Sequence, residues 1–157
     1  MTTSSRASSA ASGTTSTRDP APFWTRALAG VVGGFAGGLV FGMLMAVMGM
    51  LPMVAMLVGS ESAWIGFGIH MTISIAIGLG LTVLFGNVLL TSYLRGLLVG
   101  MVYGAIWWVL GPLLIMPLMV GMPVFTVDTT ALFSLMGHIV YGGVLGVVAV
   151  AILSRRR

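Results

Sequence analysis

Two histidines, His70 and His138, are the side chains of this sequence best suited to chemistry inside an apolar segment. His138 lies in the stretch SLMGHIVYGGVLG, where Tyr141 is the only other ionisable side chain. An imidazole titrates near neutral pH, and it also ligates metal ions and haem iron. Ionisable residues are costly in apolar segments of this kind, which favours a functional explanation for both.

The residues one helical turn away predict that both imidazoles face protein. Side chains four positions apart lie on one face of a helix. Because the rows around both histidines hold small and polar residues, we expect them at helix contacts and not against lipid. The rows are Gly66, His70, Ser74 and Gly78 in the second apolar segment, and Ser134, His138, Gly142 and Gly146 in the fourth.

Two roles use the histidines without a cofactor. As a buried polar pair, the neutral imidazoles would clasp helices together, each by a hydrogen bond to a serine, a tyrosine or the other imidazole that is worth about 1 kcal/mol. As proton carriers they would need water nearby, because a buried imidazolium is costly. They would also need partners that pass the proton on, and the candidates are Ser74, Ser134, Tyr103 and Tyr141.

Two further roles need a cofactor. His70 and His138 could be axial ligands of haem b, but glycine-rich rows permit helices about 8 Å apart, which suits direct contact better than an intervening macrocycle. The 13 methionines offer thioether ligands for Cu(I), although methionine is equally an adaptable packing residue. We therefore expect no cofactor, and haem b and Cu(I) are the alternatives.

No enzyme signature accompanies the histidines. The sequence has no cysteine, which excludes a thiol nucleophile, a thiolate metal site and disulfides. Of the three acids, only Asp128 lies near a plausible pocket, and it is better explained as the N-cap of a helix. The sequence therefore predicts a protein that is not an enzyme.

The elements that must position these residues are membrane helices. Of 157 residues, 58% are hydrophobic and 6% are charged, whereas roughly a quarter are charged in soluble proteins. A spanning helix needs about 20 apolar residues. The sequence predicts an all-α polytopic membrane protein that contacts the lipid bilayer and, since its arginines are scattered, no nucleic acid. The four predicted transmembrane helices are residues 27–50, 63–85, 94–116 and 131–153, and the predicted segment ends include Pro52, Gly86-Asn87 and Pro117.

The arginines predict the orientation of the chain. All seven fall on one side of the four-span arrangement, and the two loops on the other side contain Glu61 and Asp128 and no basic residue. The positive-inside rule then places both termini in the cytoplasm. Residues 1–22 are rich in Ser, Thr and Ala and predict a disordered tail, although this composition also fits an organellar transit peptide. The arginines are Arg6, Arg18, Arg26, Arg95, Arg155, Arg156 and Arg157.

The two halves of the chain, residues 23–86 and 87–157, align as tandem repeats. RALAGVVGGFAGG aligns with LRGLLVGMVYGA, which places Gly30 on Gly100, and a later block places His70 on His138. Each half is a two-helix hairpin that returns to its starting side. We therefore expect parallel repeats related by a pseudo-twofold axis along the membrane normal.

The sequence also predicts how deep the histidines lie in the membrane and how the helices pack. Each histidine lies ten residues after a candidate N-cap, Ser60 or Asp128, which is about 15 Å along the helix and close to the middle of the bilayer. Glycines at four-residue spacing should let helix backbones approach closely. The predicted packing glycines are Gly30, Gly34, Gly38, Gly42, Gly96, Gly100, Gly104, Gly142 and Gly146.

Several short motifs resemble the YagU-like family of small bacterial inner-membrane proteins. In the second half these are GLLVG (Gly96–Gly100), PLMVG (Pro117–Gly121), PVF (Pro123–Phe125) and Gly137-His138; in the first half, HMTISI (His70–Ile75) is similar to the H-x3-S-I segment of that family. The resemblance implies a bacterial inner membrane and a link to acid tolerance. Together with this resemblance, the buried histidines predict a stress-related, proton-linked membrane protein. The alternatives are a haem- or metal-binding subunit with His70 and His138 as ligands, or a structural subunit of a homo-oligomer or larger membrane complex.

Overall fold

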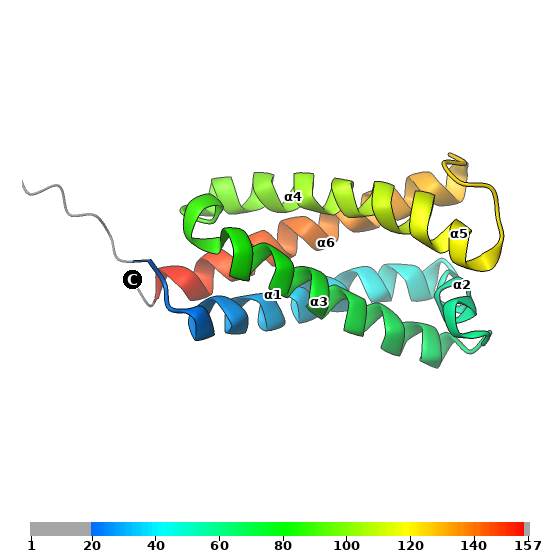
Figure 1. Cartoon of the computed structure of the whole chain (residues 1–157), viewed down its shortest axis with the longest axis horizontal. Coiled ribbons are helices and arrows are strands. Elements are labelled where there is room, and N and C mark those ends of the chain that lie inside the picture. Colours follow the sequence, from blue (N-terminus) through cyan, green and yellow to red (C-terminus); the bar gives the residue numbers. More distant parts are fainter. Residues whose placement is uncertain (1–19, 156–157) are drawn as a thin grey trace, which may run out of the picture.

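The computed structural model describes residues 20–155 and is a bundle of four long helices joined by short helical segments (Figure 1). No strand occurs in the described part of the chain. Most of the predicted tail, together with Arg6, Arg18, Arg156 and Arg157, lies outside it. The elements are α1 (Phe23–Val47), α2 (Leu51–Ala55), the 3-10 turn η1 (Met56–Val58), α3 (Ala63–Leu89), α4 (Tyr93–Leu110), the π-helical turn η2 (Gly111–Ile115), α5 (Met116–Val120) and α6 (Thr129–Ser154).

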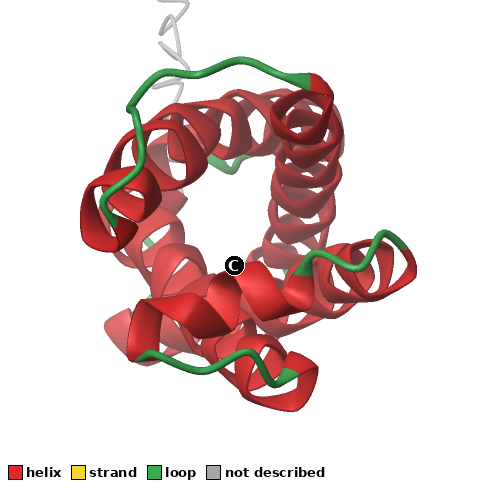
Figure 2. Cartoon of the chain, turned by 90° about the vertical axis from the view of Figure 1, so that its right-hand side faces the viewer, coloured by secondary structure: helices red, strands yellow, loops and turns green. Residues whose placement is uncertain are grey.

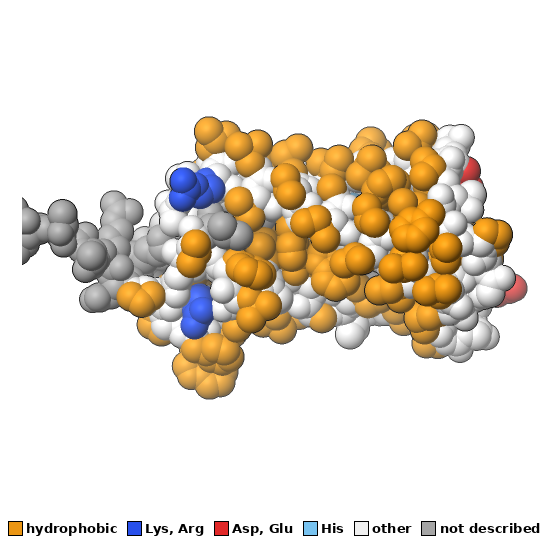
Figure 3. Space-filling model, turned by 45° about the horizontal axis from the view of Figure 1, so that its top comes forward, with side chains coloured by type: hydrophobic (Ala, Val, Ile, Leu, Met, Phe, Trp, Pro, Cys, Tyr) orange, Lys and Arg blue, Asp and Glu red, His pale blue; other side chains and the backbone are white. Residues whose placement is uncertain are grey.

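The prediction of four transmembrane helices is confirmed. Four helical stretches are long and apolar enough to cross a membrane: Phe23–Val47, Ala63–Val88, Tyr93–Val120 and Thr129–Ser154. Apolar side chains cover much of the outer surface between the two ends of the bundle (Figure 3). A soluble protein of this size rarely exposes apolar patches so extensive, whereas a lipid-facing surface requires them.

The third span is longer than predicted, because Pro117 does not end it. A proline inside a helix has no N–H to offer the carbonyl four residues earlier. Here that carbonyl belongs to Leu113, and it accepts a 2.7 Å hydrogen bond from the Phe125 N–H in the following loop. The π-helical turn η2 precedes Pro117 and absorbs the irregularity. Helical backbone therefore continues to Val120.

The predicted N-cap is correct for α6 and wrong for α3. Asp128 caps α6, where its side chain accepts a 2.8 Å hydrogen bond from the Ala131 N–H. The cap of α3 is Ser62 and not Ser60, whose hydroxyl instead accepts from the Ser62 N–H in the turn before the helix. His70 is thus eight residues into its helix and His138 ten.

Glycine rows hold each helical hairpin together. A Cβ atom at Gly34 of α1 would lie 2.6 Å from the Ser74 carbonyl oxygen of α3, and a Cβ at Gly100 of α4 would overlap the Gly142 carbonyl of α6. No larger residue fits at these contacts, because backbone meets backbone. All nine predicted packing glycines are buried at helix contacts, although Gly38 and Gly42 face side chains and not backbone: Gly30, Gly34, Gly38, Gly42, Gly96, Gly100, Gly104, Gly142 and Gly146.

A second glycine row on α1 joins the two hairpins. A Cβ at Gly33 would lie 2.8 Å from Leu145, and one at Gly37 would lie 2.7 Å from the Tyr141 carbonyl oxygen, both on α6. One face of α1 therefore packs on α3 and the next face packs on α6. The lateral order of the long helices is α3, α1, α6, α4, and seen from the end that carries α2 and α5 they surround a common axis (Figure 2).

The bundle is more open on the side of α3 and α4. A pseudo-twofold axis would make the α3/α4 contact equivalent to the extensive α1/α6 contact, but α3 and α4 barely touch. The packing register also differs from the sequence alignment. Gly34 packs against the carbonyl of Ser74, four residues after His70, and Gly100 packs against the carbonyl of Gly142, four residues after His138. In the packing Gly100 therefore corresponds to Gly34, whereas the alignment pairs it with Gly30. Relative to α3, α1 is therefore shifted by one helical turn from the position that the alignment with α4 and α6 predicts.

The two ends of the bundle carry opposite charges. Among the described residues, Arg26 and Arg95 lie in the first turns of α1 and α4, and Arg155 follows α6, all at one end. Glu61 and Asp128 lie in the connections at the other end. Figure 3 shows basic side chains toward the left end of the bundle and acidic ones at the right end. We call these the arginine end and the acidic end.

Candidate functional site

His70 lies on the face of α3 that packs against α1. Its side chain is 8% exposed, and its Nε2 donates a 3.0 Å hydrogen bond to the Gly38 carbonyl. A Cβ at Gly42, the next residue of that row, would lie 3.2 Å from the imidazole ring. Gly42 thus leaves the room that the imidazole occupies, and Gly38 supplies the acceptor.

His138 lies on α6 and is held by its own helix. Its Nδ1 donates a 2.8 Å hydrogen bond to the Ser134 carbonyl, and the Ser134 hydroxyl lies 3.4 Å from the same nitrogen. The backbone carbonyl of His138 lies against Gly104 of α4, where a Cβ would overlap it. The α4/α6 glycine contact therefore fixes the depth of His138 in the bundle.

Phe41 of α1 contacts both imidazoles. Its ring centroid lies 5.1 Å from that of His70 and 4.8 Å from that of His138, in edge-on arrangements. In the described residues neither histidine hydrogen-bonds the other, and each donates to a backbone carbonyl. The structure thus brings the two histidines to one ring and does not join them to each other by a hydrogen bond.

The sequence reasoning missed Phe41, although a signal was present. Gly33, Gly37 and Phe41 recur at four-residue spacing, one position before the row Gly34, Gly38 and Gly42. Two adjacent rows of small residues on one helix predict two packed neighbours. A large aromatic ring continuing the second row has to enter the space between those neighbours.

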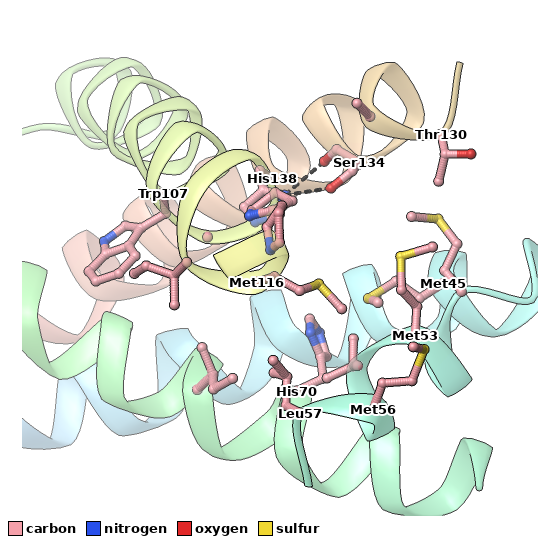
Figure 4. A pocket seen from close by; sticks show the side chains of 18 of the residues that line it. Met45, Met53, Met56, Leu57, His70, Trp107, Met116, Thr130, Ser134 and His138 are labelled. Carbon is pink, nitrogen blue, oxygen red and sulfur yellow. Dashed lines mark hydrogen bonds between the residues drawn. The ribbon is translucent and has the colours of Figure 1, made fainter. Parts of the chain in front are cut away.

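The histidines line one cavity of about 500 Å³ at the acidic end of the bundle. Figure 4 shows His70 and His138 reaching into it from α3 and α6, with Met116 pointing into the same space. Its walls are mainly apolar, and α2, η1, η2 and α5 surround its outer part. Its polar lining residues are His70, Ser74, Ser134, His138 and Tyr141 in the interior, and Thr126, Asp128 and Thr130 near the acidic end.

The four predicted hydroxyl partners have different positions. Ser134 is next to His138, as described above. Tyr141 donates a 2.6 Å hydrogen bond to the Ser74 carbonyl, which ties α6 to α3. Tyr103 donates a 2.9 Å hydrogen bond to the Ile77 carbonyl and lies outside the cavity. The Ser74 hydroxyl lines the cavity and makes no hydrogen bond to the described residues.

Methionines share this cavity with the histidines. Among the described residues, no group of three His, Cys, Asp or Glu side chains is placed to hold a metal ion. The thioether sulfurs of the methionines are further possible metal ligands, and thioethers bind Cu(I). Six methionines line the cavity: Met45, Met50, Met53, Met56, Met116 and Met122.

Comparison of the chain with protein-family models, with curated proteins and with solved structures finds no match.

Proposed function

We propose that this multi-pass membrane protein has a non-enzymatic role in acid stress, in which His70 and His138 take up protons that arrive through the cavity. The observation that supports the proposal is that both imidazoles line one cavity at the acidic end of the bundle. The positive-inside rule places the arginine end in the cytoplasm. Acid outside the membrane would then reach both histidines from the acidic end.

Each imidazole has a defined atom for the incoming proton. The carbonyls of Gly38 and Ser134 can only accept, so the nitrogens that face them carry N–H. In a neutral ring the other nitrogen then has a free lone pair. A proton from cavity water would bind His70 at Nδ1 and His138 at Nε2, and neither existing hydrogen bond would have to break.

Proton uptake would change the hydration of the cavity. An imidazolium among apolar side chains is costly unless water surrounds it. A second imidazolium against the same Phe41 ring would also be repelled by the first. Protonation should therefore shift the equilibrium toward a conformation in which the cavity holds more water.

The test is the substitution His138→Gln, because glutamine is polar but does not titrate. We expect a protein of near wild-type thermal stability in detergent, and acid survival of cells reduced to that of cells lacking the protein. Met136→Leu, on the exposed face of α6, is the matched control and should leave both measurements unchanged. A stable His138→Gln protein with wild-type acid survival would exclude the proton role.

The proposal also locates the protein in a bacterial inner membrane with both termini in the cytoplasm. The arginine distribution supports the orientation, and the resemblance to the YagU-like family supports the membrane and the link to acid. Lipid covers the apolar outer surface in this proposal. Association into a homo-oligomer or a larger membrane complex is compatible with that surface and would not involve the cavity.

Cu(I) binding is a second candidate, and one observation favours it. The six cavity methionines offer soft thioether donors beside two imidazoles. Haem b is harder to place, because Phe41 contacts both imidazoles and its ring would have to leave. Titration of the purified protein with Cu(I) under a reductant, against a colorimetric chelator, tests the candidate. Retention of all the copper by the chelator would exclude it.

A further inference from the structure

The open side of the bundle contains a second hollow. A groove of about 410 Å³ runs between α3 and α4, toward the arginine end, and all its lining side chains are apolar except for the Tyr103 hydroxyl. Several of them are exposed, including Phe85, Leu98 and Val102. Because these helices cross the membrane, the groove faces the acyl chains of the bilayer.

The groove and the cavity follow one another along the interface between α3 and α4, which we call the seam. On α3 the residues Ile73 and Ile77 line the cavity, and Leu81 and Phe85, on the next turns of the same face, line the groove. On α4 the same four-residue spacing leads from Val99 and Tyr103 in the groove to Trp107 and Gly111 in the cavity. A molecule in the groove would therefore have a direct route into the cavity along α3 and α4.

Tyr103 marks the junction between the two hollows. Its hydroxyl donates to the Ile77 carbonyl across the seam, at 2.9 Å, and Ile77 is a cavity residue. It is the one side-chain hydrogen bond between α3 and α4 in the described residues. Separating these helices thus requires the loss of one hydrogen bond and little packing.

The interior of the cavity offers hydrogen-bond acceptors without partners. The free nitrogens are His70 Nδ1 and His138 Nε2, because the other nitrogen of each ring donates to a carbonyl. Among the described residues, Arg26 Nε is the only side-chain polar atom that is both sealed from solvent and unpartnered. The two free nitrogens are therefore accessible from the cavity, and so is the Ser74 hydroxyl.

We infer that the cavity binds a lipid-soluble phenol or alcohol, which enters from the bilayer between α3 and α4. Its apolar body would contact the aliphatic and methionine side chains of the walls, and its hydroxyl would donate to a free imidazole nitrogen. A cavity of this volume is in the usual range for small-molecule sites, which are mostly apolar with a few polar groups. The inference does not depend on proton uptake.

Equilibrium binding of two matched probes tests the ligand class. The probes are 4-nonylphenol and 4-nonylanisole, which differ by the methyl group that removes the donor. Nanodiscs that contain the protein are dialysed against empty nanodiscs, so that partition into lipid cancels. We expect the phenol to bind about tenfold more tightly, the equivalent of one hydrogen bond. Equal binding of the two probes, or no excess over empty nanodiscs, would overturn the inference.

A variant that removes an acceptor adds a second readout. In His138→Leu the preference for the phenol should fall toward one, while 4-nonylanisole binds as before. Met43→Leu, on the exposed face of α1, is the control and should keep the wild-type preference. An undiminished preference in both His70→Leu and His138→Leu would contradict the role of the imidazoles. The comparison of probes on the wild-type protein stands even if one variant does not fold.

The route is tested by closing the seam. The chain has no cysteine, so Phe85→Cys with Leu98→Cys supplies one exposed thiol on each side of the groove. Joining the two with a bis-maleimide should slow association of 4-nonylphenol several-fold, whereas either single variant with the same reagent should not. Unchanged association after complete cross-linking would exclude entry between α3 and α4. Acid survival is a separate measurement, so failure here and failure of the proton role are distinguishable.

Discussion

At the scale of single residues, Phe41 connects the two halves of the site. It is 4% exposed, and its ring fills the space above Gly137 of α6 while its edges meet both imidazoles. The hydrogen bonds of the histidines are made to carbonyls and leave one nitrogen of each ring free. Phe41 therefore sets the distance between the histidines, and the carbonyls set their tautomers.

Gly137→Ala tests this arrangement, because the added Cβ would overlap the Phe41 ring. We expect a loss of about 2 kcal/mol in stability, the usual cost of overpacking, measured by thermal unfolding in detergent. Gly68→Ala is the matched control, since nothing lies within 4 Å of its Cβ position. It should be neutral or stabilising by up to about 1 kcal/mol. Phe41→Leu should partly rescue Gly137→Ala, and independent, additive effects would argue against the contact.

The residue types predicted the site only in part. Small neighbours indicated that both histidines face protein, and the structure places both inside the bundle. Their partners were not predictable, because backbone carbonyls such as that of Gly38 have no signature in a sequence. Ser134 is one turn before His138 and was within reach of local reasoning. Tyr103 and Tyr141 donate hydrogen bonds to backbone carbonyls of α3. These partners depend on how the two hairpins pack and were not predictable from the sequence.

At the scale of elements, the helices follow from local patterns and their contacts do not. Apolar length predicted four spans, and Asp128 was recognisable as a cap. Pro117 was misread because its effect depends on the Phe125 N–H, which reaches the Leu113 carbonyl from twelve residues away. The lateral order of the helices depends on which of two adjacent glycine rows meets α6, and spacing alone does not decide that.

The weak contact between α3 and α4 gives a prediction at this scale. Tyr103→Phe removes the hydroxyl that reaches the Ile77 carbonyl and keeps the ring. We expect thermal stability to fall by no more than about 1 kcal/mol. Spin labels on Phe85→Cys and Leu98→Cys, both exposed, should report a longer or broader distance between α3 and α4. Tyr93→Phe is the control, since the Tyr93 side chain is exposed and makes no hydrogen bond in the described residues. An unchanged distance distribution would mean that packing alone keeps the seam closed.

At the scale of the whole molecule, the bundle is asymmetric in two directions. Across the membrane, the described arginines occupy one end and the described acids, Glu61 and Asp128, the other. Within the membrane plane, α1 and α6 form the packed side while α3 and α4 form the open side. The tandem alignment anticipated neither the open side nor the one-turn difference between the hairpins.

The last prediction concerns the orientation of the protein in the membrane. Because the sequence has no cysteine, single introduced cysteines can test it. Single cysteines at Ser62 and Thr130 lie on exposed positions at the acidic end, and one at Ser154 lies on an exposed position at the arginine end. If the arginine end is cytoplasmic, a membrane-impermeant maleimide should label the first two in intact spheroplasts and the third only after lysis. The cysteine-free wild-type protein is the control for background. The reverse pattern would place the cavity on the cytoplasmic side, and protons from outside could then not enter it directly.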